Sequence, residues 1–301
     1  MIELRHLTKH FAGRLAVDDL SLTVHRGEIF GLLGHNGAGK STTIGMMLGQ
    51  VWPTGGELRV CGHDVTTQRG RALKKVGAIF ETPAFHDYFS GWRNLEMLAS
   101  YTAAVSPARL DEVIHWVGLT GREHSKVRTY SHGMRARLAI AQAMLPHPEL
   151  LILDEPGNGL DPEGIHEMRH TILRLHRELG LTILLSSHLL NEVEQLCSRI
   201  AVLNQGRKVF EGTLDEATSR SNWVRLRVGD FAAAVKALRA ERLITDQRDG
   251  CLITLAEGIG TDRVVRRLVE QGMPVFEVAP EEETLEDFYL TLMKGRRGTV
   301  A

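Results

Sequence analysis

A phosphate-binding loop is predicted at residues 34–42, where GHNGAGKST fits the spacing G-x-x-x-x-G-K-[ST]. The apolar run EIFGLL precedes this loop and a helical pattern follows it, as the motif requires. Glycines let successive backbone N–H groups surround phosphate oxygens, and the helix start adds its positive end. Lys40 would neutralise the β- and γ-phosphates of ATP, and the Ser41 hydroxyl would bind magnesium. The residues expected at the nucleotide are Gly34, His35, Asn36, Gly37, Ala38, Gly39, Lys40, Ser41 and Thr42.

Two neighbouring acids, Asp154 and Glu155, follow the apolar run at 150–153. Beside a phosphate loop, one carboxylate at such a strand end suits magnesium and the other suits the attacking water. Alone, an Asp-Glu pair in this setting is as often structural or a helix cap. Combined with the phosphate loop, it predicts ATP hydrolysis.

The elements that must position these residues form an α/β pattern. Apolar runs at 150–153 and 181–185 lack polar alternation, as expected for strands buried on both faces. Between Pro83 and Pro148 only helical spacing occurs, which predicts a helical subdomain (about 83–148) inserted into the sheet. The expected strands are Ile2–Leu7, Leu20–Val24, Ile29–Leu33, Glu57–Val60, Val76–Phe80, Leu150–Leu153, Thr182–Leu185 and Ile200–Leu203.

A second domain is expected after the first. Residues 1–215 form the predicted ATPase domain, and residues 216–301 show a strand and helix order of β-α-β-β-α-β. That order is typical of a small ferredoxin-like α+β domain. The segment EEETLEDFYLTLMKGRR then predicts a closing amphipathic helix, with acids at its start and bases at its end.

Composition indicates an ordinary globular protein. The 301 residues are 43% hydrophobic and carry a net charge of -1, so no nucleic-acid partner is expected. Cys61, Cys197 and Cys251 form no C-x-x-C pair, which suits a reducing, cytoplasmic setting. We find neither a signal peptide nor a long apolar stretch. At a membrane, another chain would have to supply the spans.

Several motifs together carry a family resemblance over about residues 1–215. In order, these are GHNGAGKST, YSHGMRARLAIAQAML, LLILDEP, GNGLDP at 157–162 and SSH at 186–188. They resemble the Walker A motif, the signature motif and its helix, the Walker B motif, the D-loop and the switch histidine of ABC transporter ATPase subunits. The resemblance implies a P-loop NTPase core that binds ATP and Mg2+.

The resemblance also implies a head-to-tail dimer that encloses two ATP molecules. By it, Asp154 holds magnesium, Glu155 polarises the hydrolytic water and His188 contacts the γ-phosphate. Ser131 and Gly133 would reach the ATP of the partner subunit, since a hydroxyl and an N–H at a helix N-terminus suit an anion. Taken alone, His188 would be an ordinary histidine at a strand end.

An aromatic position completes the expected nucleotide site. Phe11 falls where the family stacks an aromatic ring on adenine, although a lone Phe could as well pack in a core.

Four positions depart from the commonest family pattern. His35 replaces a frequent proline, the signature reads YSHGM at 130–134, and Gly157 replaces serine or threonine. Glu81 stands where the family has glutamine. We expect Glu81 to lie on the magnesium side of the site and not to orient the water; the alternative is a surface glutamate after a strand.

Aromatic residues gather directly after Glu81, in a region where the family receives a short helix of its membrane partner. They are Phe80, Phe85, Tyr88, Phe89, Trp92 and Tyr101. Clustered aromatics make good contact anchors. Some would instead pack the helical subdomain, so Phe85, Tyr88 and Phe89 are the docking candidates.

The favoured function is the ATPase subunit of a membrane exporter, held at the cytoplasmic face by a permease on another chain. Glu81, the signature and the ending TLEDFYLTLM resemble an exporter branch that includes antibiotic-resistance ATPases. The active dimer could pair identical or related ATPase subunits. The alternative is a non-transport ABC ATPase. A single Walker A motif argues against the translation type, and the absence of heptads argues against the repair type.

Overall fold

The computed structural model describes residues 1–80, 84–101, 105–218, 223–248, 250–281 and 284–294. The chain divides into two compact units, Met1–Leu214 and Asp215–Ala301. Each unit has a hydrophobic core of its own. No helix within the described ranges is both long enough and apolar enough to cross a bilayer.

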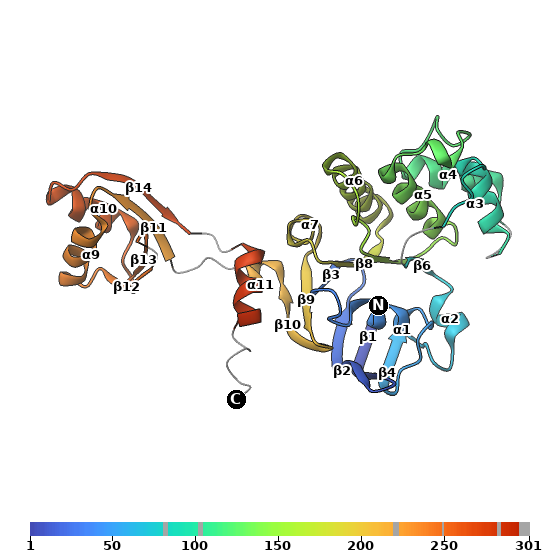
Figure 1. The fold of residues 1–301 in the computed structure, drawn as a ribbon, viewed down its shortest axis with the longest axis horizontal. Coiled ribbons are helices and arrows are strands. Elements are labelled where there is room, and N and C mark those ends of the chain that lie inside the picture. The colour runs from blue at the N-terminus through green and yellow to red at the C-terminus, as the bar shows by residue number, and fades with distance from the viewer. Residues whose placement is uncertain (81–83, 102–104, 219–222, 249, 282–283, 295–301) are drawn as a thin grey trace. The chain divides into compact units, whose positions relative to one another are not determined.

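A six-stranded sheet forms the centre of the N-terminal unit (Figure 1). Its order is β10-β9-β3-β8-β7-β6, and all neighbours are parallel except β10 and β9. Because β3, β8 and β7 are consecutive and parallel, the loops after their carboxyl ends meet at one edge. The strands are β3 (Ile29–Leu33), β6 (Val76–Ile79), β7 (Leu150–Asp154), β8 (Thr182–Ser187), β9 (Arg199–Asn204) and β10 (Arg207–Thr213).

An antiparallel sheet packs with helix α1 (Lys40–Met47) against the central one. Its strands, in the order β2-β1-β4-β5, are β1 (Ile2–Phe11), β2 (Arg14–Val24), β4 (Gly55–Val60) and β5 (His63–Asp64). Fully buried Phe30 of β3, Leu20 of β2 and Ile44 of α1 share one core. This packing holds α1 in place and with it the loop that precedes it.

Helices fill the chain between β6 and β7 and form the inserted subdomain (Figure 1). They are α3 (Gly91–Ala99), α4 (Pro107–Trp116), the 3-10 helix η1 (Val127–Thr129) and α5 (His132–Met144); α2 (Arg69–Leu73) precedes β6. The serines Ser90, Ser106 and Ser131 cap α3, α4 and α5 by accepting a backbone hydrogen bond.

Two further helices follow the central strands β7 and β8. Helix α6 (Pro162–Leu179) begins after Asp161, whose side chain accepts a hydrogen bond from the Gly164 amide. It ends at Gly180, whose φ of 66° suits a glycine terminator. Helix α7 (Leu190–Leu196) follows β8. Asp154 is the last residue of β7, while Glu155 lies between β7 and α6 and His188 lies between β8 and α7.

The C-terminal unit begins with the short helix α8 (Leu214–Ala217). Its main elements are β11 (Trp223–Val228), α9 (Phe231–Ala240), β12 (Ile244–Arg248), β13 (Leu252–Leu255), α10 (Thr261–Glu270), β14 (Val275–Pro280) and α11 (Leu285–Lys294). The sheet is antiparallel throughout, in the order β12-β13-β11-β14. Together with the β-α-β-β-α-β chain order, this is the ferredoxin-like arrangement.

The predicted P-loop α/β core with a helical insertion is confirmed, but the strand prediction was incomplete. Strands β5 and β10 were not expected, and β1 and β2 are longer than predicted. Strand β10 carries Arg207, Lys208 and Glu211, and it pairs antiparallel at the sheet edge. A half-exposed edge strand lacks the continuous apolar run by which the buried strands are recognised.

Candidate nucleotide-binding and hydrolysis site

The loop between β3 and α1 lines a pocket of about 400 Å³. Gly39 caps α1 with a φ of 107°, and a Cβ there would lie 2.8 Å from the Ala16 carbonyl oxygen. Only glycine fits both constraints. The lining residues are Phe11, Arg14, Ala16, His35, Asn36, Gly37, Gly39, Lys40, Ser41, Thr42 and Glu155. Apart from Gly34 and Ala38, every loop residue predicted to meet the nucleotide therefore lines this pocket.

Lys40 is the charged centre of this pocket. The side chain is only 5% exposed, and Nζ donates to the Gly34 carbonyl oxygen at 2.6 Å. Nζ also lies 3.1 Å from Glu155 Oε1. The ammonium group is thus fixed where the phosphates of a nucleotide in the loop would lie.

Glu155 connects the phosphate loop to the switch histidine. Its Oε2 lies 2.5 Å from His188 Nδ1, while Oε1 faces Lys40. The backbone of Glu155 has a φ of 49°, an uncommon conformation for a residue other than glycine. Its amide donates to the carbonyl and the hydroxyl oxygen of Ser186, at 3.2 and 3.0 Å. These bonds hold the strained turn in place.

Asp154 ends β7 and is 7% exposed. Its Oδ1 accepts a hydrogen bond of 2.5 Å from the buried Ser186 hydroxyl. Among the described residues no cluster of three His, Cys, Asp or Glu side chains forms a metal cage. Magnesium does not need one, because it commonly takes one or two protein oxygens together with phosphate oxygens and water. The Asp154 carboxylate and the Ser41 hydroxyl are hard oxygen donors that fit this role.

Sequence reasoning assigned no role to three residues that contact the site, namely Arg14, Asn204 and Ser186. The Arg14 guanidinium donates to the Gly37 carbonyl oxygen at 3.4 Å, and the His35 ring lies 3.2 Å from Asn204 Oδ1. Ser186 supports both acids. Ser186 precedes His188 by two residues at the end of an apolar run, which is a usable signal. Nothing in the sequence signals Asn204, which lies 169 positions from His35.

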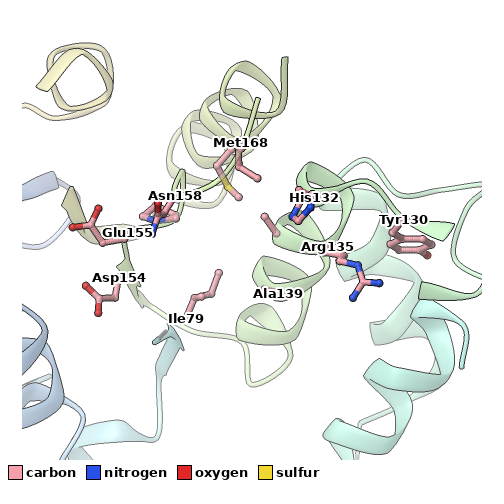
Figure 2. A pocket seen from close by; sticks show the side chains of 12 residues that line it. Ile79, Tyr130, His132, Arg135, Ala139, Asp154, Glu155, Asn158 and Met168 are labelled. Carbon is pink, nitrogen blue, oxygen red and sulfur yellow. The ribbon is translucent and has the colours of Figure 1, made fainter. Parts of the chain in front are cut away.

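The signature residues lie outside the phosphate-loop pocket of the same chain. Ser131 caps α5, and Gly133 packs so closely that a Cβ there would lie 3.2 Å from Gly164 Cα. A second pocket, of about 560 Å³, separates the start of α5 from the end of β7. Figure 2 shows Asp154 and Glu155 on one side of it and His132 on the other.

The aromatic docking candidates differ in exposure. Tyr88 is 76% and Phe89 is 42% exposed, whereas Phe85 is half-buried. The Arg128 guanidinium lies 6.0 Å from the Tyr88 ring centroid. Tyr101, which was not chosen, is 79% exposed. Glu81 lies outside the described residues, so the expectation for it stays a prediction.

The fold and the pocket define a P-loop ATPase. A family model described as "ABC transporter" matches residues 17–158. An uncharacterised ABC transporter ATP-binding protein of Bacillus subtilis, YhcH, is 41% identical over 293 residues, which are 97% of this chain and 95% of YhcH. The daunorubicin/doxorubicin resistance ATP-binding protein DrrA of Streptomyces peucetius is 38% identical, over 97% of this chain and 92% of DrrA.

A solved ATP-binding subunit of an ABC transporter superposes with a TM-score of 0.63 at 30% identity, over 72% of this chain and 91% of that one. The chain therefore belongs to the ATP-binding proteins of ABC transporters. It is an ATPase of that family.

Proposed function

We propose that the chain powers a membrane exporter through ATP-driven dimerisation and magnesium-dependent hydrolysis at sites shared by two subunits. One observation carries the hydrolytic part of the proposal. The Glu155 carboxylate lies between Lys40 Nζ, at 3.1 Å, and His188 Nδ1, at 2.5 Å, beside the phosphate-loop pocket. The three residues come from different parts of the chain: Lys40 from α1, Glu155 from the loop after β7 and His188 from the loop after β8. In the proposal they act as the phosphate-binding cation, the general base and the γ-phosphate contact.

In the proposed reaction, Glu155 orients the attacking water and accepts its proton. When ATP binds, Lys40 exchanges its ion pair with Glu155 for ion pairs with the β- and γ-phosphates. The Glu155 carboxylate is then available to the attacking water. His188 keeps Glu155 in place and contacts the γ-phosphate. Asp154 and Ser41 would hold Mg2+, which would neutralise charge on the phosphate oxygens.

The dimer part of the proposal rests on the position of α5. Ser131 is exposed at the start of α5 and Gly133 is buried two residues further along, and both lie outside the phosphate-loop pocket of their own chain. A helix N-terminus attracts anions, so a second subunit could present these two residues to the ATP of the first. The partner could be an identical chain or a related ATPase subunit.

The transport part rests on the family and on one relative. DrrA is named a drug-resistance protein, which favours export over import. We place the chain at the cytoplasmic face of the membrane, held there by a permease on a separate chain. Exposed Tyr88 and Phe89, with Phe85 beside them, are proposed to receive that permease. Replacing Tyr88 and Phe89 by Ala should reduce permease co-purification while ATPase activity persists; loss of folding would instead assign them to packing.

Glu155→Gln tests the hydrolytic site. Removing the base while keeping the shape of the side chain should lower kcat by roughly 10²–10⁴-fold. ATP affinity should stay within about threefold, because Lys40 and the phosphate loop remain. The control is Glu163→Gln, on the exposed first turn of α6. Hydrolysis that persists in Glu155→Gln would refute the assigned base. A full chain that co-purifies only with soluble proteins would refute the transport assignment and favour a non-transport ABC ATPase.

A further inference from the structure

The carboxyl group of Glu192 lies between the two loops that carry the proposed catalytic pair. Glu192 is on the first turn of α7, four residues after His188. Its Oε2 accepts a hydrogen bond of 3.3 Å from the Ser187 hydroxyl, in the loop of His188. Its Oε1 faces Gly157, in the loop of Glu155, where an added Cβ would lie only 2.1 Å away. The carboxyl group therefore contacts both loops at once.

The environment of this carboxyl group is costly to maintain. Oε1 is buried and has no hydrogen-bond partner in the part of the chain that the structure describes. Leaving a buried polar atom unpaired is energetically unfavourable, because the atom has lost its hydrogen bonds to water. Burial, reinforced by the charge of Glu155, raises the pKa of Glu192, while the Ser187 hydrogen bond opposes the rise. A costly polar group beside a reaction site is a candidate for a functional role.

Gly157 and Glu192 form a matched pair. Gly157 lies two residues after Glu155, opposite the Glu192 carboxyl group. A side chain there would collide with the Glu192 carboxyl group, since an added Cβ would also lie 2.8 Å from Cδ. Glycine at 157 thus leaves the space that the Glu192 carboxyl group fills, and the carboxyl group in turn packs against the backbone of that loop.

We propose that Glu192 is a positioning residue that sets the spacing between the loops of Glu155 and His188. The proposal rests on the roles assigned above to those two residues. Their side chains lie 2.5 Å apart, and the carboxyl group of Glu192 joins the backbone segments on either side. Small displacements of reacting groups can cost about 100-fold in rate. The Gly157–Glu192 contact therefore acts on turnover more than on ATP binding.

A double-mutant cycle in the full chain tests this role. Glu192→Ala should lower kcat about tenfold and leave the KM for ATP within about twofold, because the phosphate loop is untouched. Glu192→Gln keeps the shape of the side chain and should restore most of the rate. Gly157→Ala should lower kcat as well, by displacing the carboxyl group. The double variant Gly157→Ala/Glu192→Ala should be no slower than the worse single variant.

The control is Gln195→Ala, on the exposed part of the same helix, which should leave kcat unchanged. If Glu192→Ala does not fold, Glu192→Asp replaces it in the cycle, since it withdraws the carboxyl group by one methylene. An unchanged kcat in Glu192→Ala, multiplicative effects in the double variant, or a failure of Glu192→Gln to restore the rate would overturn the proposal. These outcomes leave the proposed function intact as long as Glu155→Gln is inactive; an active Glu155→Gln refutes the proposed function first.

Discussion

The two units of this chain place their polar groups in opposite ways. In the N-terminal unit, charged side chains are buried at the site: Asp154 at the end of β7 and Lys40 at the start of α1. In the C-terminal unit, the described residues that are buried are all hydrophobic, and charged residues such as Arg227 and Glu277 pair on the surface. Both units combine helices with a sheet, and each has a hydrophobic core of its own. Among the residues that the structure describes, charged side chains are buried in the N-terminal unit alone.

This difference separates packing from chemistry. Burying a charge is costly unless it is paired, so a buried charge that lines a pocket is a candidate functional group. The positive φ of Glu155 adds backbone strain at the same place. The buried residues that the structure describes in the C-terminal unit are apolar, so hydrophobic packing holds its ferredoxin-like core together. We therefore expect damage to the first unit to remove activity and damage to the second to remove stability.

The strongest test of this contrast is Lys40→Ala. An ammonium group about 4 Å from a phosphate charge contributes roughly 4 kcal/mol at an effective dielectric near 20. Its loss should weaken ATP binding by two to three orders of magnitude while the protein stays folded. Isothermal titration with ATP and thermal unfolding measure the two effects. Lys75→Ala, in a surface pair with Glu149, is the control and should change ATP affinity less than twofold. A small effect of Lys40→Ala would mean that buried charge does not mark function here.

The converse test is Leu226→Ala in the second unit. Leu226 is 1% exposed and belongs to the core formed with α9 and α10. Removing such a side chain should lower the free energy of unfolding by about 2–5 kcal/mol. ATP affinity and kcat should not change. Leu290→Ala, at a leucine that is 45% exposed, should cost less than 1 kcal/mol. Urea unfolding measures the stability and an ATPase assay measures kcat. A lower kcat under conditions where Leu226→Ala is fully folded would contradict the expected difference between the two units.

The sequence predicts best where local pattern and function coincide. The phosphate loop was found because glycines, lysine and the flanking strand and helix lie within one segment. Lys40, Glu155 and His188 were each identified by motif, and the structure places the Glu155 carboxylate in contact with both Lys40 and His188. The half-exposed edge strand β10 was missed because its sequence has no apolar run.

Contacts between distant segments were beyond prediction. The Ser187–Glu192–Gly157 arrangement joins loops 30 positions apart, and no local pattern in the sequence signals that contact. Gly157 faces the Glu192 carboxyl group only because the loop after β7 packs against α7 in the folded protein. The same holds for His35 and Asn204, which come from opposite ends of the N-terminal unit.

The smallest expected effect concerns pH and sharpens the contrast at Glu192. Burial raises the pKa of this carboxyl group above its value in the unfolded chain, which is about 4.3 for glutamate. The folded protein therefore retains the proton longer. Relative to the non-titrating Glu192→Gln, the wild-type protein should be most stable below about pH 4.3 and lose that advantage as the pH rises through the folded pKa.

Thermal unfolding of both proteins between about pH 4 and 8 measures this change, and 1 kcal/mol corresponds to about 2–4 °C in a domain of this size. The groups that act on Glu192 are Glu155, which raises its pKa, and Ser187, His188 and Arg169, which lower it. Ser187→Ala removes a lowering contact, so it should steepen the pH dependence of the wild-type background and leave that of Glu192→Gln unchanged. A difference in melting temperature that is constant with pH would show that Glu192 is ionised at little cost, and its buried, unpaired oxygen would then need another explanation.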